Sequence, residues 1–219
     1  MKQEVKPTRR YDATRRQEAA QETRQVILDA AYALFLERGY RATTMPAIAA
    51  AARVNVDTIY AAIGRKPDLV RLLLELALSG VDQPIPALQR AYVREIQAEP
   101  DARRKLVRYA RAVCDIQERF VPIVQVLTEA AASDASLAAL WTEISERRAA
   151  NMRLFATDLA STGRLRDGLS IDQAADIIWA TNSPEFYVLL VEARGWTPDE
   201  LESWLADAWA RLLLANDES

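Results

Sequence analysis

The sequence contains no histidine and a single cysteine, Cys114. Without histidine the common serine and cysteine hydrolase triads cannot form, because each needs an imidazole as its base. One thiol cannot make a disulfide within the chain, and it offers too few ligands for a structural zinc site. We therefore expect no metal, no cofactor and no histidine-dependent catalysis.

Glycine and long apolar runs are also scarce. Only 6 of the 219 residues are glycine, while 50% are hydrophobic, which suits a helical protein with a large core. No apolar run approaches the roughly 20 residues that a membrane span requires, and the first residues are charged rather than signal-like. We expect an all-α protein that has no membrane segment and resides in the cytoplasm.

Charge is divided unevenly along the chain. Residues 1–66 contain 12 Lys and Arg against 7 Asp and Glu, net +5, whereas the remainder contains 16 against 24, net −8. A local positive surface attracts the phosphate backbone of DNA, even in a protein that is acidic overall. The basic residues within 1–20 are expected to form a flexible arm, which either follows DNA or serves only as a solvated tail.

Residues 27–69 have the spacing of several short helices. Apolar residues three and four positions apart predict a helix that ends at Gly39. Thr44 is a good N-cap for a second helix, and Asn55 for a third over residues 56–62. This order is the outline of a helix-turn-helix, whose last helix presents its start to the major groove.

At these residues the sequence resembles the TetR (tetracycline-repressor) family of bacterial transcription regulators. The resemblance is strong over the helix-turn-helix DNA-binding segment, here called the reader, and looser over the rest of the chain. The family usually has Gly, Ser, Gly, Phe and Ser at or near the positions of Arg53, Asn55, Asp57, Ile63 and Arg65. The matching positions are Ala30, Ala31, Leu34, Phe35, Glu37, Gly39, Tyr40, Thr43, Thr44, Ile48, Ala49, Ala52, Val54, Thr58, Ile59, Tyr60, Lys66 and Leu69.

The resemblance implies a homodimeric regulator, most often a repressor, that binds a palindromic operator in double-stranded DNA and is released by a small molecule. Residues at the start of the third helix are expected to contact base edges, where Asp57 would accept a hydrogen bond from a cytosine amino group. Residues that match phosphate-binding positions of the family are expected to fix the register on DNA. The predicted DNA-binding residues are Thr44, Arg53, Asn55, Val56, Asp57, Thr58, Tyr60 and Lys66.

We divide the chain into the arm at 1–20, a helix-turn-helix DNA-binding domain at 21–66 and a helical regulatory and dimerisation domain at 67–219. The first helix of the third part, residues 67–79, links the reader to the regulatory domain. By the family resemblance, a ligand that shifts the far end of this helix would change the spacing of two recognition helices.

Local signals predict where the other helices begin and end. A helix is expected over residues 86–98, and Pro122 is expected to interrupt or restart a later one. Asp134 or Ser133 is expected to cap a long helix that runs through residue 160. Two sequences have the pattern of a capping box, and they begin at Ser170 and Thr197.

Arg148 falls on the inner face of the predicted long helix, where an unpaired charge is costly to bury. It is either an anchor for an anionic or carbonyl group of a ligand, or a member of an ion pair with Glu129, Asp115 or Glu185, or a side chain that snorkels to solvent. Aromatic and polar residues around it are expected to line a largely apolar pocket. The predicted ligand-binding residues are Tyr109, Gln117, Trp141, Arg148, Asn151, Phe155, Trp179, Asn182 and Phe186.

The last predicted helix has apolar residues over about half of its circumference. This width indicates either contact with a second copy of the chain, as in the family that the sequence resembles, or a stripe that is wholly internal. Tryptophan is a common anchor of interfaces. The predicted interface residues are Trp204, Ala208, Trp209 and Leu212.

Two other functions are alternatives to a ligand-responsive regulator. An architectural or interaction protein would use the same reader without an effector, and a second domain without a cavity would favour it. An enzyme would need converging carboxylates, but Glu143, Glu146 and Asp158 are expected mostly on polar helix faces, and the sequence identifies no group that converges with them. We expect no enzymatic activity.

Overall fold

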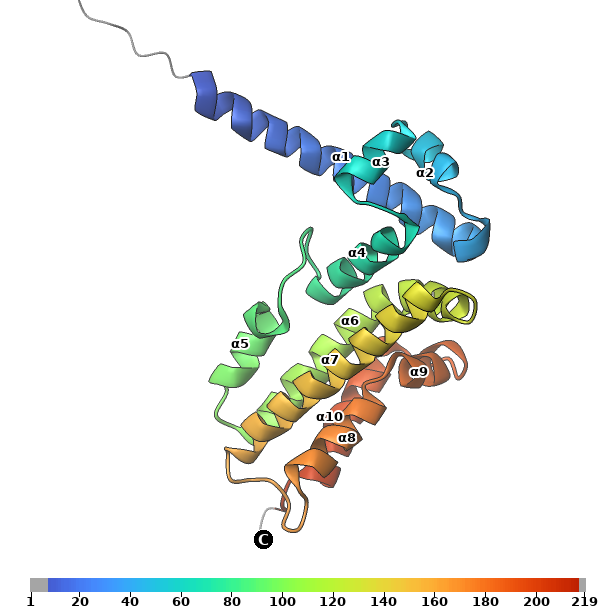
Figure 1. Ribbon diagram of the computed structural model, residues 1–219. Coiled ribbons are helices and arrows are strands. Elements are labelled where there is room, and N and C mark those ends of the chain that lie inside the picture. The colour runs from blue at the N-terminus through green and yellow to red at the C-terminus, as the bar shows by residue number, and fades with distance from the viewer. Residues whose placement is uncertain (1–7, 217–219) are drawn as a thin grey trace, which may run out of the picture. The chain divides into compact units, whose positions relative to one another are not determined.

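The computed structural model describes residues 8–216, with side chains from Arg15 onward, and it confirms an all-α protein (Figure 1). Within this range the only extended pairing is one antiparallel bridge between Leu165 and Leu214. None of the helices described is both long and apolar enough to cross a membrane. The chain divides into two compact units, here called unit 1, which ends at Leu73, and unit 2, which begins at Leu74.

Unit 1 contains α1 (Thr8–Ala42), α2 (Met45–Ala52), α3 (Val56–Ala62) and the first part of α4 (Lys66–Ser79). α1 is broken at Gly39, whose φ of +76° and ψ of 168° lie outside the helical region. Residues other than glycine rarely adopt a positive φ. The predicted end of the first long helix at this glycine is confirmed.

α1 begins at Thr8, earlier than the sequence suggested. Residues 8–20, which we expected in a flexible arm, are helical, and residues 1–7 of that arm lie outside the described residues. The sequence between Pro7 and Gly39 contains no helix breaker and is rich in Arg, Gln, Glu and Ala, which have high helix propensity. Because the side chains of residues 15–22 are exposed, intrinsic propensity accounts for this part of the helix.

The core of unit 1 draws one or more buried side chains from each of its helices. At most 1% of the surface is exposed in Phe35 of α1, Ile48 of α2, Ile59 of α3 and Leu69 of α4. The ring of Phe35 also stacks on that of Tyr40, with 5.8 Å between ring centroids. These contacts fix the orientation of the short helices α2 and α3, which would be marginal in isolation.

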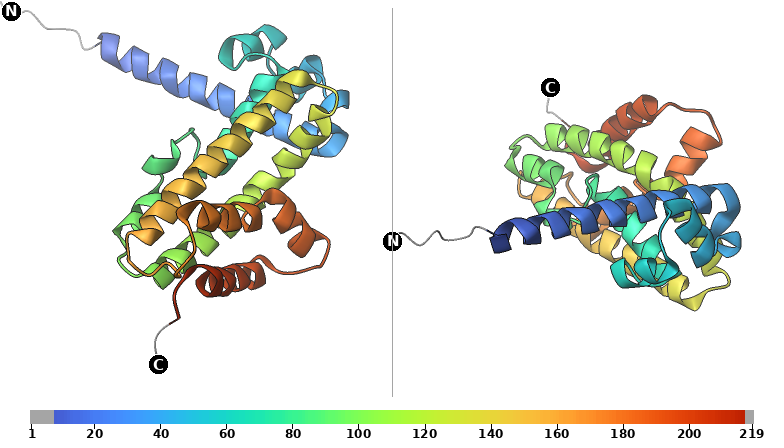
Figure 2. Two further views of the ribbon diagram at one scale, coloured as in Figure 1. Left: turned by 60° about the horizontal axis from the view of Figure 1, so that its bottom comes forward. Right: turned by 90° about the horizontal axis from the view of Figure 1, so that it is seen from above.

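Two long helices form the centre of unit 2. α6 (Ala102–Ala131) and α7 (Ala135–Ala160) run side by side, as Figures 1 and 2 show. α8 (Ile171–Thr181) packs on α7, and α10 (Pro198–Leu213) packs on α6. Their shared core contains Trp209, which is fully buried.

Shorter elements complete unit 2. The helix that we expected over residues 86–98 is divided at Arg90 into a 3-10 turn, η1 (Ala87–Gln89), and α5 (Ala91–Ala98). After α8 comes α9 (Pro184–Tyr187), which continues as a π-helix, η2 (Val188–Glu192).

α6 continues through Pro122, so the expected interruption at this residue is wrong. Proline in a helix interior removes one hydrogen bond and costs about 3 kcal/mol or more. Burial of each large apolar side chain contributes about 1.5–3 kcal/mol. Four neighbours in α6 have at most 4% of their surface exposed, and their combined burial outweighs the cost: Phe120, Val121, Ile123 and Val124.

The predicted helix caps of unit 2 are confirmed. The Asp134 side chain accepts from the backbone N–H of Ser136 at 2.9 Å and begins α7. The capping boxes at Ser170 and Thr197 have both of their reciprocal hydrogen bonds, so they begin α8 and α10.

Candidate functional site

The turn between α2 and α3 depends on Arg53. Its φ of +56° and ψ of 40° place it in the left-handed region, and among the described residues no other non-glycine residue has a positive φ. This conformation costs a residue with a Cβ roughly 1–2 kcal/mol. The side chain itself is exposed. The turn therefore has a left-handed conformation that glycine adopts most easily, and Arg53 adds a positive charge at its surface.

Both predicted N-caps of the helix-turn-helix are present. Thr44 Oγ1 accepts from the backbone N–H of Ala47 at 3.2 Å, and Asn55 Oδ1 accepts from that of Asp57 at 3.0 Å. Both cap side chains are exposed. Each cap satisfies a donor at the start of its helix and fixes the first turn.

α3 has one buried and one exposed face. Ile59 is fully buried and packs α3 against the other helices of unit 1. Asp57 is exposed, Tyr60 has 49% of its surface exposed, and Val56 and Thr58 are half-buried. Helical geometry places residues three or four positions apart on one face, so the start of α3 offers an accessible polar surface.

Lys66 is engaged within unit 1. Its Nζ atom donates to the carbonyl oxygens of Tyr40 and Thr43, each at 2.8 Å, and lies 4.0 Å from the centroid of the Tyr40 ring. Carbonyl groups near the end of a helix lack intrahelical partners and attract cations. In this structure the Lys66 ammonium therefore joins the start of α4 to the end of α1.

Unit 2 contains a cavity of about 680 Å³. This volume lies within the range of small-molecule sites in proteins, about 300–1,000 Å³. Its wall is formed by the end of α4, the segment from Pro84 to Gln97, α6 and α7, together with Asn182 and Pro184. Most of the lining is apolar and includes Leu78, Ile85, Leu88, Val93, Ile116 and Phe120.

The cavity brings together six of the nine residues that we predicted to bind a ligand. These six are Tyr109, Gln117, Arg148, Asn151, Phe155 and Asn182. Trp141, Trp179 and Phe186 are absent from its lining. The contribution of α7 begins at Ile144, one turn after Trp141, while Phe186 stacks on Trp204 at 5.5 Å between centroids.

Several lining residues were not anticipated. Tyr92 and Ile96 come from α5, and Glu75 comes from the end of α4. The apolar residues of α5 are spaced for one helical face, but that pattern alone does not distinguish a cavity wall from a filled core.

Arg148 lies at the centre of a polar cluster. Its Nη1 atom donates to the carbonyl oxygen of Trp179 at 2.5 Å and to Oδ1 of Asn182 at 2.6 Å. The guanidinium carbon lies 4.4 Å from the centroid of the Trp179 ring. Gln117 Nε2 donates to the backbone oxygen of Asn182 at 2.6 Å. Asn182 therefore holds both side chains through separate oxygens.

Burial strongly affects the two titratable members of this cluster. It raises the pKa of the Tyr109 hydroxyl far above its ordinary value, so the group stays protonated. The Tyr109 hydroxyl accepts from Asn182 Nδ2 at 2.7 Å and donates to Met152 Sδ at 3.0 Å. Burial lowers the pKa of Arg148, although a guanidinium remains charged at neutral pH.

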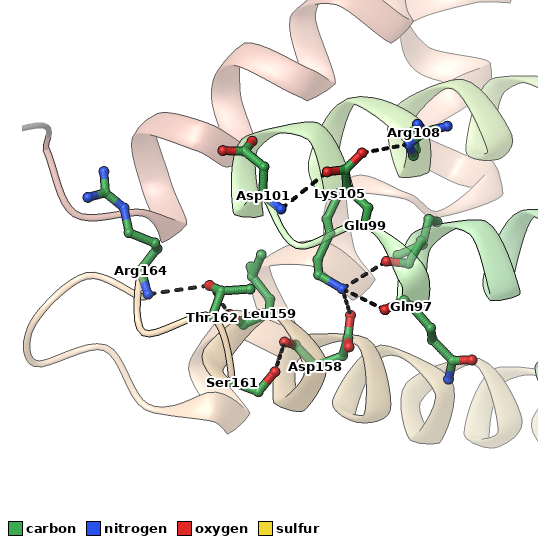
Figure 3. Close-up of polar contacts among 11 residues, drawn as sticks. Gln97, Glu99, Asp101, Lys105, Arg108, Asp158, Leu159, Ser161, Thr162 and Arg164 are labelled. Carbon is green, nitrogen blue, oxygen red and sulfur yellow. Dashed lines mark hydrogen bonds and ion pairs between the residues drawn. The ribbon is translucent and has the colours of Figure 1, made fainter.

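A second polar cluster joins α5, α6 and α7, as Figure 3 shows. Lys105 has only 2% of its surface exposed, and its Nζ atom lies 2.7 Å from Oδ2 of Asp158. The same ammonium donates to the carbonyl oxygen of Ile96 at 2.8 Å. Asp158, which the sequence places on a polar face without a convergent group, therefore has a partner in Lys105, and the sequence alone does not predict this cluster.

The predicted interface residues of α10 separate into two sets. Trp209 is fully buried within one chain and donates from Nε1 to Thr181 Oγ1 at 2.7 Å, so its assignment as an interface anchor is wrong. Trp204 and Leu212 have 39% and 40% of their surfaces exposed, and Ala208 is half-buried. Packing against α6 and α8 selects which part of the broad apolar stripe is internal.

Comparison with known proteins supports the assignment of the first segment. Residues 27–72 match the family model described as bacterial regulatory proteins, tetR family. The HTH-type transcriptional regulator HbdR of Aromatoleum sp. (strain CIB) is 41% identical over 66 residues, which cover 30% of this chain and 29% of that regulator.

Solved structures extend the similarity to the whole fold. NalD, the secondary repressor of the MexAB-OprM multidrug efflux pump in Pseudomonas aeruginosa, is 24% identical, with a TM-score of 0.68 over 88% of this chain and 98% of that one. FadR from Bacillus subtilis, solved in complex with stearoyl-CoA, is 18% identical, with a TM-score of 0.68 over 86% of this chain and 98% of that one.

Residues 27–72 are therefore similar to the tetR family of bacterial regulatory proteins, which agrees with the resemblance found in the sequence. The solved structures show that the chain shares its all-α fold with NalD and FadR.

Proposed function

We propose that this chain is a homodimeric transcriptional repressor that binds a palindromic operator and is released by a small molecule. The observation that carries the proposal is the course of α4. This helix begins beside the reader, where Lys66 contacts the end of α1, and its last turns contribute Glu75 and Leu78 to the cavity. One continuous helix thus connects the two parts that an effector-controlled regulator requires.

On the DNA, α3 lies in the major groove. Val56, Asp57 and Thr58 read base edges from its first turn, and Asp57 accepts from a cytosine amino group. Thr44, Arg53 and Tyr60 contact phosphates, and the Asn55 cap keeps the first turn of α3 in place. The exposure of Arg53 and Tyr60 supports these roles.

Lys66 acts in this proposal chiefly through the protein. Its ammonium is bound to the carbonyl oxygens of Tyr40 and Thr43, so its removal would disturb the junction between α1, α2 and α4. Weaker DNA binding by a Lys66 variant would then follow from displacement of Thr44, which directly follows Thr43.

The dimer forms through the exposed apolar residues of α10. Trp204, Ala208 and Leu212 supply the interface, while Trp209 serves the core of each protomer. Exposed apolar side chains clustered on one helix are typical of contact surfaces. Two copies related by a twofold axis would present two α3 helices to successive major grooves of a palindrome.

The cavity supports control by an effector over the alternative of an architectural protein, which would have no use for one. The NalD and FadR similarities support repression and ligand binding respectively. An effector in the cavity would contact the end of α4 and change the spacing of the two readers. The site of action is the cytoplasm, where a bacterial operator lies.

The experiment is selection of bound sequences from random duplex DNA by the purified chain, with mass determination of the complex. A palindrome bound by two or four chains supports the proposal. Binding without enrichment of any sequence favours the architectural protein, and a lack of binding even at low salt contradicts both. The variant Leu212→Glu tests the dimer in the same experiment, since it should reduce the complex to one chain, whereas Leu36→Glu, on an exposed position of unit 1, should not.

A further inference from the structure

The side chains that line the cavity carry more positive than negative charges. The lining contains three arginines and two carboxylates. Glu75 accepts from Arg147 at 2.6 Å, and Asp158 accepts from Lys105 at 2.7 Å (Figure 3). Neither carboxylate is therefore available to the two remaining arginines, Arg90 and Arg148.

The hydrogen-bond partners of Arg90 and Arg148 are neutral. Arg148 Nη1 donates to Trp179 and Asn182, and Arg90 Nε donates to the carbonyl oxygen of Ile85 at 3.1 Å. The sequence offers Glu129, Asp115 and Glu185 as ion-pair partners of Arg148, but none of them lies within 4.0 Å of its guanidinium. Of the three, only Glu185 interacts electrostatically with Arg148, at longer range. The half-buried guanidinium thus lacks a counterion in the described part of the chain.

Arg148 also has unused donors. A guanidinium carries five N–H groups in a planar fork, and the two hydrogen bonds that Arg148 donates to the described residues both leave from Nη1. The donors on Nη2 and Nε have no acceptor among these residues and remain for a ligand. Such a fork matches the two oxygens of a carboxylate, and a bond between them is among the strongest hydrogen bonds in proteins.

Gln117 supplies a complementary acceptor. Its side chain is buried, with 5% of its surface exposed, and it lines the cavity. Its Nε2 atom is bonded to Asn182, but its Oε1 atom has no hydrogen-bond partner among the described residues. A buried acceptor left unpaired costs free energy, so a ligand that donates to it would be favoured. Gln117 and Arg148 both bind Asn182, and hence they serve the same end of the ligand.

The rest of the wall suits an apolar body. Tyr92 and Ile96 of α5 face this space together with Phe155 of α7, whose ring lies 4.5 Å from that of Tyr109 between centroids. Sites of this kind bind their ligands chiefly by apolar contact, and a few polar groups fix the orientation.

We propose that the effector is an amphipathic organic acid: its carboxylate binds Arg148, a hydroxyl or N–H group beside the carboxylate donates to Gln117 Oε1, and its apolar chain or ring packs against α5 and Phe155. This inference rests on the proposed function, because it specifies the effector of the proposed regulator. The second uncompensated guanidinium, Arg90, adds to the positive potential of the cavity and disfavours cationic ligands.

The test is titration calorimetry of the full chain with four probes of equal chain length: decanoate, 2-hydroxydecanoate, 1-decanol and decyltrimethylammonium. We expect decanoate to bind at least tenfold more tightly than 1-decanol, 2-hydroxydecanoate to bind more tightly still, and the cation to bind most weakly. Binding of decanoate that is absent, or no tighter than that of the alcohol or the cation, would overturn the proposal.

Variants assign the effect to the named residues. Arg148→Gln should lower decanoate affinity about tenfold or more and remove the preference over 1-decanol. The control Arg153→Gln, on the same helix but outside the cavity lining, should change the affinity less than threefold. Gln117→Met should remove only the additional affinity for 2-hydroxydecanoate. Equal losses in Arg148→Gln and Arg153→Gln would refute the anchor. The probe comparison on the unaltered chain remains decisive if Arg148→Gln does not fold.

DNA binding separates this inference from the proposed function. A chain that selects a palindrome but does not prefer the organic acid leaves the regulator intact and overturns the effector class. A chain that prefers the organic acid but selects no DNA overturns the regulator.

Discussion

The Lys105 ammonium lies 2.7 Å from Oδ2 of Asp158 and 2.8 Å from the carbonyl oxygen of Ile96, so one buried cation connects α6 to both α7 and α5. Since α5 and α7 both contribute residues to the cavity wall, this contact joins two parts of that wall. Glu99, the residue that ends α5, is likewise buried and accepts from Arg108 Nε at 3.3 Å.

Replacement of Lys105 by methionine should destabilise the protein. The substitution keeps an unbranched side chain, one atom shorter, but leaves the Asp158 carboxylate and the Ile96 carbonyl without the donor that Lys105 supplies. Removing one partner of a buried pair typically costs about 3–5 kcal/mol, and because Asp158 is partly exposed we expect about 2–3 kcal/mol. Urea denaturation at pH 7 measures the change.

The control for this prediction is Arg153→Met, which removes the pair with Asp172. Both side chains of that pair are more than 60% exposed, and exposed pairs contribute about 0–1 kcal/mol. An equal loss of stability in the two variants would contradict the structural role of Lys105.

Arg53→Gly should change stability and DNA binding in opposite directions. Glycine adopts φ +56° without strain, but it also gains freedom in the unfolded chain, so we expect a net stabilisation of about 0.5–1 kcal/mol. Loss of the proposed phosphate contact should weaken DNA binding and reduce the salt dependence of the affinity by about one phosphate. Thermal denaturation and binding titrations at several salt concentrations measure the two effects.

Arg53→Ala is the matched comparison, because alanine removes the guanidinium and keeps the backbone strain. It should weaken DNA binding as glycine does, without the gain in stability. If glycine at this position lowered stability below that of alanine, the left-handed conformation assigned to Arg53 would be incorrect.

Stability should fall in mildly alkaline solution because of Cys114. Burial raises the pKa of this thiol to about 12, above its ordinary value of 9.0. A raised pKa in the folded state contributes stability that is complete below pH 9 and is lost as the pH rises toward 12. Between pH 8.5 and 10.5 the loss from this group should be about 2 kcal/mol.

Urea denaturation at these two pH values checks the prediction in the unaltered chain and in Cys114→Ala. The variant should lose about 2 kcal/mol less stability over this interval than the parent. Identical losses would show that the thiol ionises as readily in the folded chain as in the unfolded one.

Local interactions explain what the sequence predicted well. The caps at Thr44, Asn55, Asp134, Ser170 and Thr197 each bind a backbone N–H two or three positions further along the chain. A hydrogen bond of this range can be predicted from the spacing of residues alone, so the starts of all five helices can be predicted as well.

Features that depend on packing were missed or misplaced. Pro122 has the local properties of a helix breaker, but buried neighbours keep it within α6. Trp204 and Trp209 share one apolar stripe, and only the contacts of α10 with α6 decide that Trp209 is internal. The cavity wall from α5 and the contact between Lys105 and Asp158 join residues far apart in the sequence, so periodicity could not indicate them.

The role of α3 as the recognition helix is tested most directly by the affinity of Thr58→Ala and Tyr60→Phe for the selected duplex and for duplexes changed at single base pairs. Tyr60→Phe should weaken binding to all duplexes by a similar factor, since a phosphate contact carries no sequence information. Thr58→Ala should alter the order of preference at one position of each half-site. Unchanged affinity and unchanged preference in both variants would contradict the assignment of α3 as the recognition helix.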